Sequence, residues 1–298
     1  MISAFFSGVF TLAGLTIREA LRRRIFLAAL VIAALYVGLA FLPLHIRPSF
    51  LVGLDMVSAK NNTGRLFVWL GCGTIKFFGS VLAVALSAGA ITSEIDRGVL
   101  SVIVPKPIPR SAIYIGKWLG IVTLLLVCVL GWGGLLAWSV WKQTGTYHPR
   151  LWGGVLAAGL FPLLFTTLTL FFSTFATQAL SSSLALIAAG IALAESLLHR
   201  LSEPLALNSP TLETLSKICG YVVPLGRMNH WITRGLDATG LGAAPPGSAG
   251  LDFSLVLESR DPTSLARVAV AAPDMTYILV YMAACFALGL FLFGRRDL

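Results

Sequence analysis

The stretch ITSEIDRGVLSVIVPKPIPR, residues 91–110, is charged and rich in proline, and it lies between two long apolar runs. Ser93 and Asp96 have the spacing of a capping box, and Glu94 joins Asp96 where the positive end of a helix favours carboxylates. With Arg97, this short helix can make charge-assisted hydrogen bonds to a second protein. We therefore expect docking, although an ordinary connector with a solvated charged face would carry the same residues. An apolar face repeats at helical intervals and prolines end the helix: Ile95, Val99, Val102, Ile103, then Pro105, Pro107 and Pro109.

Residue types that perform catalysis or bind metals do not gather in this sequence. The four cysteines are scattered without a CxxC pair and the four histidines are equally dispersed, so neither a disulfide framework nor a zinc site is indicated. The sequence also lacks HExxH and the phosphate-binding pattern GxxxxGK[ST]. We expect no catalytic residue, metal or cofactor in this chain, and any ATP that drives it would bind another chain.

The composition indicates a membrane protein. Of 298 residues, 57% are hydrophobic and 12% are charged, about half the charged share of a typical soluble domain. The net charge of +9 is explained by basic residues that flank membrane spans. Basic residues interleaved with stacking aromatics are not found, so a nucleic-acid partner is not expected.

Six apolar runs are long enough to cross a bilayer as helices, which predicts an all-α integral membrane protein. Six crossings place both termini on one side, and the short loops of that side carry ten Lys and Arg residues against five on the other. This bias predicts cytoplasmic termini in an inner (plasma) membrane. The expected spans are 25–44, 66–91, 118–141, 151–177, 179–198 and 275–293, within a transmembrane domain of residues 25–298.

Residues 1–24 precede the first span and predict an amphipathic helix. Polar residues recur every three or four positions opposite an apolar arc, a pattern suited to the lipid headgroup plane. Arg18, Glu19 and Arg22 lie on its charged part. A cleaved signal peptide is the alternative, but here the charges follow the apolar stretch instead of preceding it.

Residues 200–273 form the longest segment between spans and fall on the outer side in this topology. The sequence GLGAAPPGSAG (residues 240–250) is turn-rich. The preceding LSKICGYVVPLG is apolar enough to dip into the membrane, so a small outer subdomain and a re-entrant segment both remain open.

Two ionisable residues lie within the expected spans. Lys76 is near mid-depth of the second span, where a lysine usually faces a cavity or a partner. The alternative is a lysine that snorkels toward the outer headgroups. Glu195 lies near the outer end of the fifth span, in a helix whose Ser181, Ala185 and Ala189 form a small-residue ridge suited to close packing.

The stretch ITSEIDRGVLSVIVPKPIPRSAIYIGKWLG resembles the type-2 ATP-binding-cassette (ABC) exporter permeases, in which an acidic pair precedes Gly-x-Leu, Pro-x-x-Arg and Gly-Lys-x-x-Gly. TIREALRRRIFLAAL is similar to the amphipathic helix of that family, and FLFGRRDL to its basic C-terminal end. Within the family, the chain is most similar to the permeases for copper-enzyme maturation, the nitrous-oxide-reductase accessory type. The matching motif residues are Glu94, Asp96, Gly98, Leu100, Pro107, Arg110, Gly116, Lys117 and Gly120.

The resemblance implies a coupling helix at 94–104, inside a cytoplasmic coupling segment at 92–117, that docks on a separate ATPase. It implies a homodimer of permeases with two ATPase subunits, which bind the ATP and Mg. It also implies that the second and fifth spans line the pathway, so that Lys76 and Glu195 face each other across it. The residues implied in coupling are Glu94, Asp96, Arg97, Gly98, Leu100, Pro107 and Arg110.

The function that follows is that of a permease subunit of an ABC exporter, with no enzymatic activity of its own. One alternative is a mechanotransmission component that acts on a periplasmic accessory protein through residues 200–273 without transport. The other is a secondary carrier, which usually shows internal repeats and mid-membrane acids that this sequence lacks. The sequence does not indicate the transported substrate.

Overall fold

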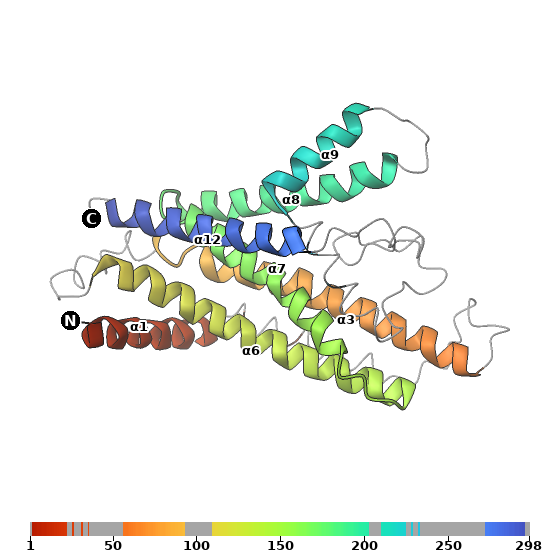
Figure 1. Cartoon of the computed structure of the whole chain (residues 1–298). Helices are drawn as coiled ribbons and strands as arrows, with labels where there is room; N and C mark the ends of the chain where they lie inside the picture. Colours follow the sequence, from red (N-terminus) through yellow and green to blue (C-terminus); the bar gives the residue numbers. More distant parts are fainter. Residues whose placement is uncertain are drawn as a thin grey trace.

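The computed structural model describes residues 2–22, 26, 31, 35, 56–92, 109–202, 210–224, 228, 232 and 272–295. Every regular element within these residues is a helix, which confirms the expected all-α class (Figure 1). The helices are α1 (Ile2–Arg22), α3 (Met56–Ser87), α6 (Arg110–Thr144), α7 (Leu151–Phe172), α8 (Gln178–Ser202), α9 (Pro210–Val222) and α12 (Ala272–Arg295).

Four helical segments among the described residues are long and apolar enough to cross a membrane, and they coincide with the second, third, fourth and sixth expected spans. The first expected span, 25–44, lies outside the described residues except for three isolated positions. The fifth lies in α8, whose described side chains form a shorter apolar stretch, Gln178–Ile191. A multi-pass membrane protein is thus confirmed, and the count of six stays a prediction. The four segments are Phe67–Ser87, Arg110–Lys142, Leu151–Phe172 and Thr276–Arg295.

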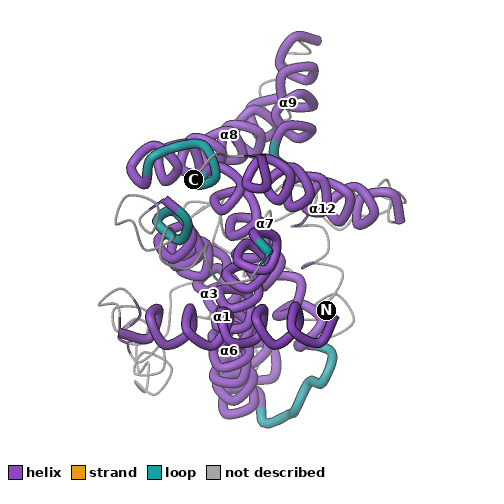
Figure 2. Tube along the Cα trace, turned by 90° about the vertical axis from the view of Figure 1, so that its left-hand side faces the viewer, coloured by secondary structure: helices purple, strands orange, loops and turns teal. Residues whose placement is uncertain are grey.

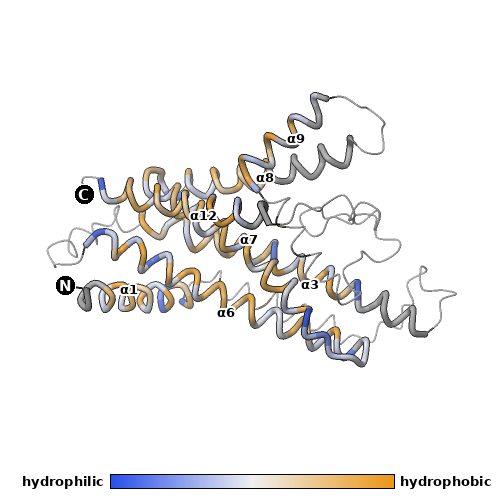
Figure 3. The backbone as a smooth tube through the Cα atoms, in the orientation of Figure 1, coloured by the Kyte–Doolittle hydropathy of each residue, from blue (hydrophilic) through white to orange (hydrophobic). Residues whose placement is uncertain are grey.

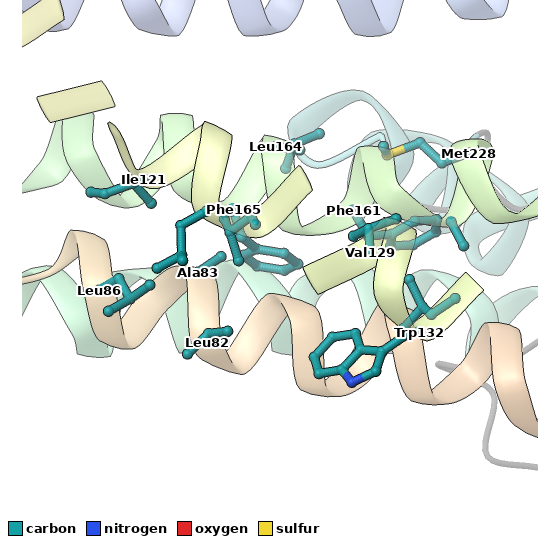
Figure 4. Close-up of a cluster of buried hydrophobic side chains, with 14 of the residues drawn as sticks. Leu82, Ala83, Leu86, Ile121, Val129, Trp132, Phe161, Leu164, Phe165 and Met228 are labelled. Atoms are coloured by element: carbon teal, nitrogen blue, oxygen red, sulfur yellow. The ribbon is translucent and has the colours of Figure 1, made fainter. Parts of the chain in front are cut away.

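The core lies where α3, α6 and α7 pack side by side (Figure 4). Gly79 of α3 lies so close to α7 that an added Cβ would be 3.2 Å from Cγ of Pro162. Figure 3 shows apolar residues along α7 and the middle of α6, with hydrophilic ones nearer the ends of α6. Buried side chains from all three helices interlock: Leu82, Ala83 and Leu86 of α3, Ile121, Val129 and Trp132 of α6, and Phe161, Leu164 and Phe165 of α7.

Both chain ends lie at the same end of the helical bundle, together with the turn that joins α7 to α8 (Figure 1). Helix α6 begins at Arg110, directly after the extended Pro109, so residues 110–117 of the expected coupling segment form the first turns of this long helix. An even number of membrane crossings requires both termini at one end of the bundle, and the observed position of the termini agrees with an even number.

Helix α1 lies across the start of α6, seen side-on in Figure 2 where α6 is viewed nearly along its axis. Two glycines of α6 permit this approach: an added Cβ would be 2.8 Å from Cβ of Leu12 at Gly116, and 2.8 Å from the carbonyl oxygen of Ala13 at Gly120. Part of the expected amphipathic helix therefore packs on protein. Its buried residues are Val9, Ala13 and Ala20, while Phe6, Phe10, Leu15, Arg18, Glu19, Leu21 and Arg22 are exposed.

The first part of the 200–273 insertion packs back on the bundle. Helix α9 lies against α8, and the hydroxyl of Tyr277 in α12 donates a hydrogen bond of 2.7 Å to the carbonyl oxygen of Tyr221 in α9. Three residues that follow α9 join the buried core: Val223, Met228 and Ile232.

Replacing Gly120 with alanine tests the close approach of α1. The added methyl group meets the backbone of Ala13, so we expect Gly120→Ala to lower the free energy of unfolding by about 1–3 kcal/mol, the usual cost of overpacking. Gly131→Ala on the same helix is the control, since nothing lies within 4 Å of its added Cβ. SDS titration in mixed micelles measures both, and equal effects would contradict the α1–α6 contact.

Candidate functional site

The site is built at the end of α3, where the chain turns toward the expected coupling segment. Residues 88–91 make a tight turn, with hydrogen bonds from Ala88 N to Val84 O (2.9 Å) and from Ala90 N to Ser87 O (3.1 Å). All residues from Ser87 to Thr92 are buried. Buried backbone carbonyls after the last turn of a helix need partners from outside that helix. Helices α8 and α6 supply donors to two of them, and Thr92 itself bonds the α7–α8 turn.

The α7–α8 turn holds Thr92. The Thr92 hydroxyl lies 3.0 Å from the carbonyl oxygens of both Ser173 and Ala176, and 3.1 Å from the Ser173 hydroxyl. One hydroxyl donates to one carbonyl at a time and can accept from Ser173. Thr92, the first residue of the expected coupling segment, is therefore fixed to the ends of α7 and α8.

Helix α8 holds the preceding turn. The Ser181 hydroxyl lies 2.9 Å from the carbonyl oxygen of Ala88, to which it donates. Gly89 lies against the first residue of α8, where an added Cβ would be 2.9 Å from Cδ of Gln178. Ser181 and Ala185 are fully buried, so the small-residue ridge expected in this helix packs inside the chain.

Helix α6 supplies the third contact through Lys117. Its ammonium group donates a hydrogen bond to the carbonyl oxygen of Ala90, and its side chain is 5% exposed. A cation is favourable there because the C-terminal end of a helix carries partial negative charge. Thr16 and Glu19 of α1 line the same small hollow as Lys117 and Ala90.

Most residues expected to contact the ATPase lie outside the described residues. Arg110 opens α6 with a half-buried side chain. Arg18, Glu19 and Arg22 lie exposed on α1, and their contact with lipid headgroups stays a prediction. The others remain predictions: Glu94, Asp96, Arg97, Gly98, Leu100 and Pro107.

Lys76 points into the bundle. Its side chain is 2% exposed, and its Nζ lies 4.6 Å from the ring centroid of Phe161 in α7. A cation over an aromatic face is favourable, more so when desolvated, and this position differs from the snorkelling alternative. Glu195 lies in α8, but its side chain is outside the described residues, so the pairing of the two residues is untested.

Thr92, Ser173 and the role of Ser181 were missed by sequence reasoning, because their partners lie more than eighty positions away in the chain. Lys117 had a signal: it belongs to the Gly-Lys-x-x-Gly motif and lies in an otherwise apolar run. Helix α1 packs against the glycines of that motif. The lysine of the motif donates a hydrogen bond to the end of α3.

The model of one protein family, described as ABC-2 family transporter protein, matches residues 10–298. No curated protein matches this chain.

Replacing Thr92 with the isosteric valine tests the bond between the α3 end and the α7–α8 turn. The buried carbonyls of Ser173 and Ala176 lose a donor, so we expect the free energy of unfolding to fall by about 1–3 kcal/mol. Thr123→Val is the control, since Thr123 is exposed and its hydroxyl bonds only Leu119 O of its own helix. SDS titration compares them, and a loss no greater for Thr92→Val than for Thr123→Val would refute the assignment.

Proposed function

Because the chain belongs to the ABC-2 transporter family, whose model spans residues 10–298, we propose that it is an exporter permease driven by a separate ATPase. Membership makes it a membrane-embedded subunit of an ABC transporter and not a catalytic enzyme. The proposal adds the direction of transport, the docking segment and the assembly: a homodimer with two ATPase subunits in an inner membrane, with cytoplasmic termini. The resemblance to permeases for copper-enzyme maturation favours that subfamily.

The anchored turn at the end of α3 is the observation that supports coupling. Side chains of α6 and α8 donate to the carbonyls of residues 90 and 88, and Thr92 donates to carbonyls of the α7–α8 turn. Helix α6 begins at Arg110 on the other side of the segment. A displacement of residues 93–109 is thus applied to packed helices at both ends. Packed cores pass on such displacements because they deform little.

A separate ATPase supplies the nucleotide chemistry in this proposal. The sequence has no GxxxxGK[ST] pattern to hold phosphates, so ATP and Mg bind the partner. The termini support the cytoplasmic assignment in part: they share one end of the bundle with the turn that holds the coupling segment (Figure 1).

Lys76 is our candidate for the pathway, with Glu195. The buried ammonium over Phe161 is an intramembrane charge of the kind that usually marks a substrate route. We expect Lys76→Leu to reduce ATP hydrolysis of the purified assembly in lipid, while assembly is retained. Wild-type hydrolysis in Lys76→Leu would assign the lysine to packing alone.

The coupling residues are tested by charge reversal. Truncating one partner of a buried interfacial charge pair costs about 2–5 kcal/mol, so Arg97→Glu should release the ATPase or abolish its stimulation while the spans still insert. The measurement is ATP hydrolysis and subunit content of the assembly, affinity-purified from its own membranes. Arg150→Glu, an exposed arginine in the α6–α7 loop at the other end of α6, is the matched control. If Arg97→Glu co-purifies with the wild-type amount of ATPase and stimulates its hydrolysis fully, the helix is only a connector.

A further inference from the structure

The first turns of α6 contact three other helices on different sides. Gly116 and Gly120 lie against α1. Lys117, between them, bonds the end of α3. Tyr114 packs on α12, where its hydroxyl would meet any Cβ added at Gly289. These first turns of α6, where the expected coupling segment ends, are therefore a junction of α1, α3 and α12.

Lys117 occupies the centre of this junction. Its neighbours Gly116 and Gly120 carry no side chains, so α1 lies directly on the α6 backbone beside the lysine. Burying an ammonium group is costly unless it is hydrogen-bonded and near negative charge. The Ala90 carbonyl oxygen accepts its hydrogen bond, and Glu19 of α1 lines the same hollow. Both features favour the charged lysine between α1 and the end of α3.

We propose that Lys117 is a positioning residue that joins the end of α3 and helix α1 into one unit, so that the coupling segment and the headgroup helix move together. The inference rests on the proposed function for the source of that movement. The exposed face of α1 presents Phe10, Arg18 and Arg22, an apolar and basic combination suited to a lipid surface. A lipid surface that binds this face of α1 would therefore restrict the movement of the coupling segment.

Hydrogen–deuterium exchange of the chain in lipid nanodiscs tests the physical link without any ATPase. Loss of the charge-assisted bond in Lys117→Met should speed exchange at residues 88–91 by about ten- to hundredfold. Exchange within 9–20 of α1 should rise with it, while α7 (Leu151–Phe172) stays protected. Lys117→Arg should restore protection, and Lys142→Met, an exposed lysine at the far end of α6, should change nothing.

If Lys117→Met does not fold, Lys117→Gln takes its place, since a neutral amide keeps a donor but not the charge. Faster exchange at 88–91 without any change in α1 would overturn the inference. So would equal acceleration in α1, α3 and α7, which indicates general destabilisation.

The same variants in the purified assembly separate this inference from the proposed function. We expect the Lys117→Met assembly to keep its ATPase partner. The factor by which anionic lipid stimulates ATP hydrolysis should be about fivefold smaller than in the wild type. Unchanged lipid stimulation would overturn the coupling of α1. A wild-type assembly that contains no ATPase would overturn the proposed function, whereas the exchange result would still decide the α1–α3 link.

Discussion

The backbone carbonyls at the end of α3 need hydrogen-bond donors, and the arrangement around them depends on that need. In an apolar bundle, water does not satisfy them and each unsatisfied group is costly. Ser181 donates to Ala88 and Lys117 donates to Ala90, from helices on either side. These bonds fix α3 relative to α6 and α8, and Thr92 extends the connection to the α7–α8 turn.

The same region explains why the Gly-Lys-x-x-Gly motif combines two residue types. The glycines remove side chains where α1 crosses α6, and the lysine reaches α3 from between them. Helix α1, expected in the headgroup plane, and the segment that we propose docks on an ATPase are thereby anchored within two turns of one helix. The proposed coupling requires such rigidity between the driven segment and the spans.

The sequence predicted what depends on local periodicity. Apolar runs located four described spans, and the polar repeat located α1. Contacts between distant residues have no such signal. Ser181 was expected to pack closely, but its bond to Ala88 across 93 positions was not foreseeable. Helix α1 was expected to face lipid, and its packing on Gly120 depends on a tertiary contact that amphipathic patterning does not encode. The mid-span position of Lys76 was predictable, and its aromatic partner Phe161 was not.

The central claim is that the coupling helix expected at residues 94–104 docks on a separate ATPase. Photo-crosslinking from a benzoylphenylalanine placed at Ser101, in the native membranes of the protein, tests it most directly. The account predicts an adduct with a polypeptide that carries the GxxxxGK[ST] phosphate loop, with a yield that changes when ATP is added. Adducts with lipid or with other copies of this chain, and none with an ATPase, would contradict it.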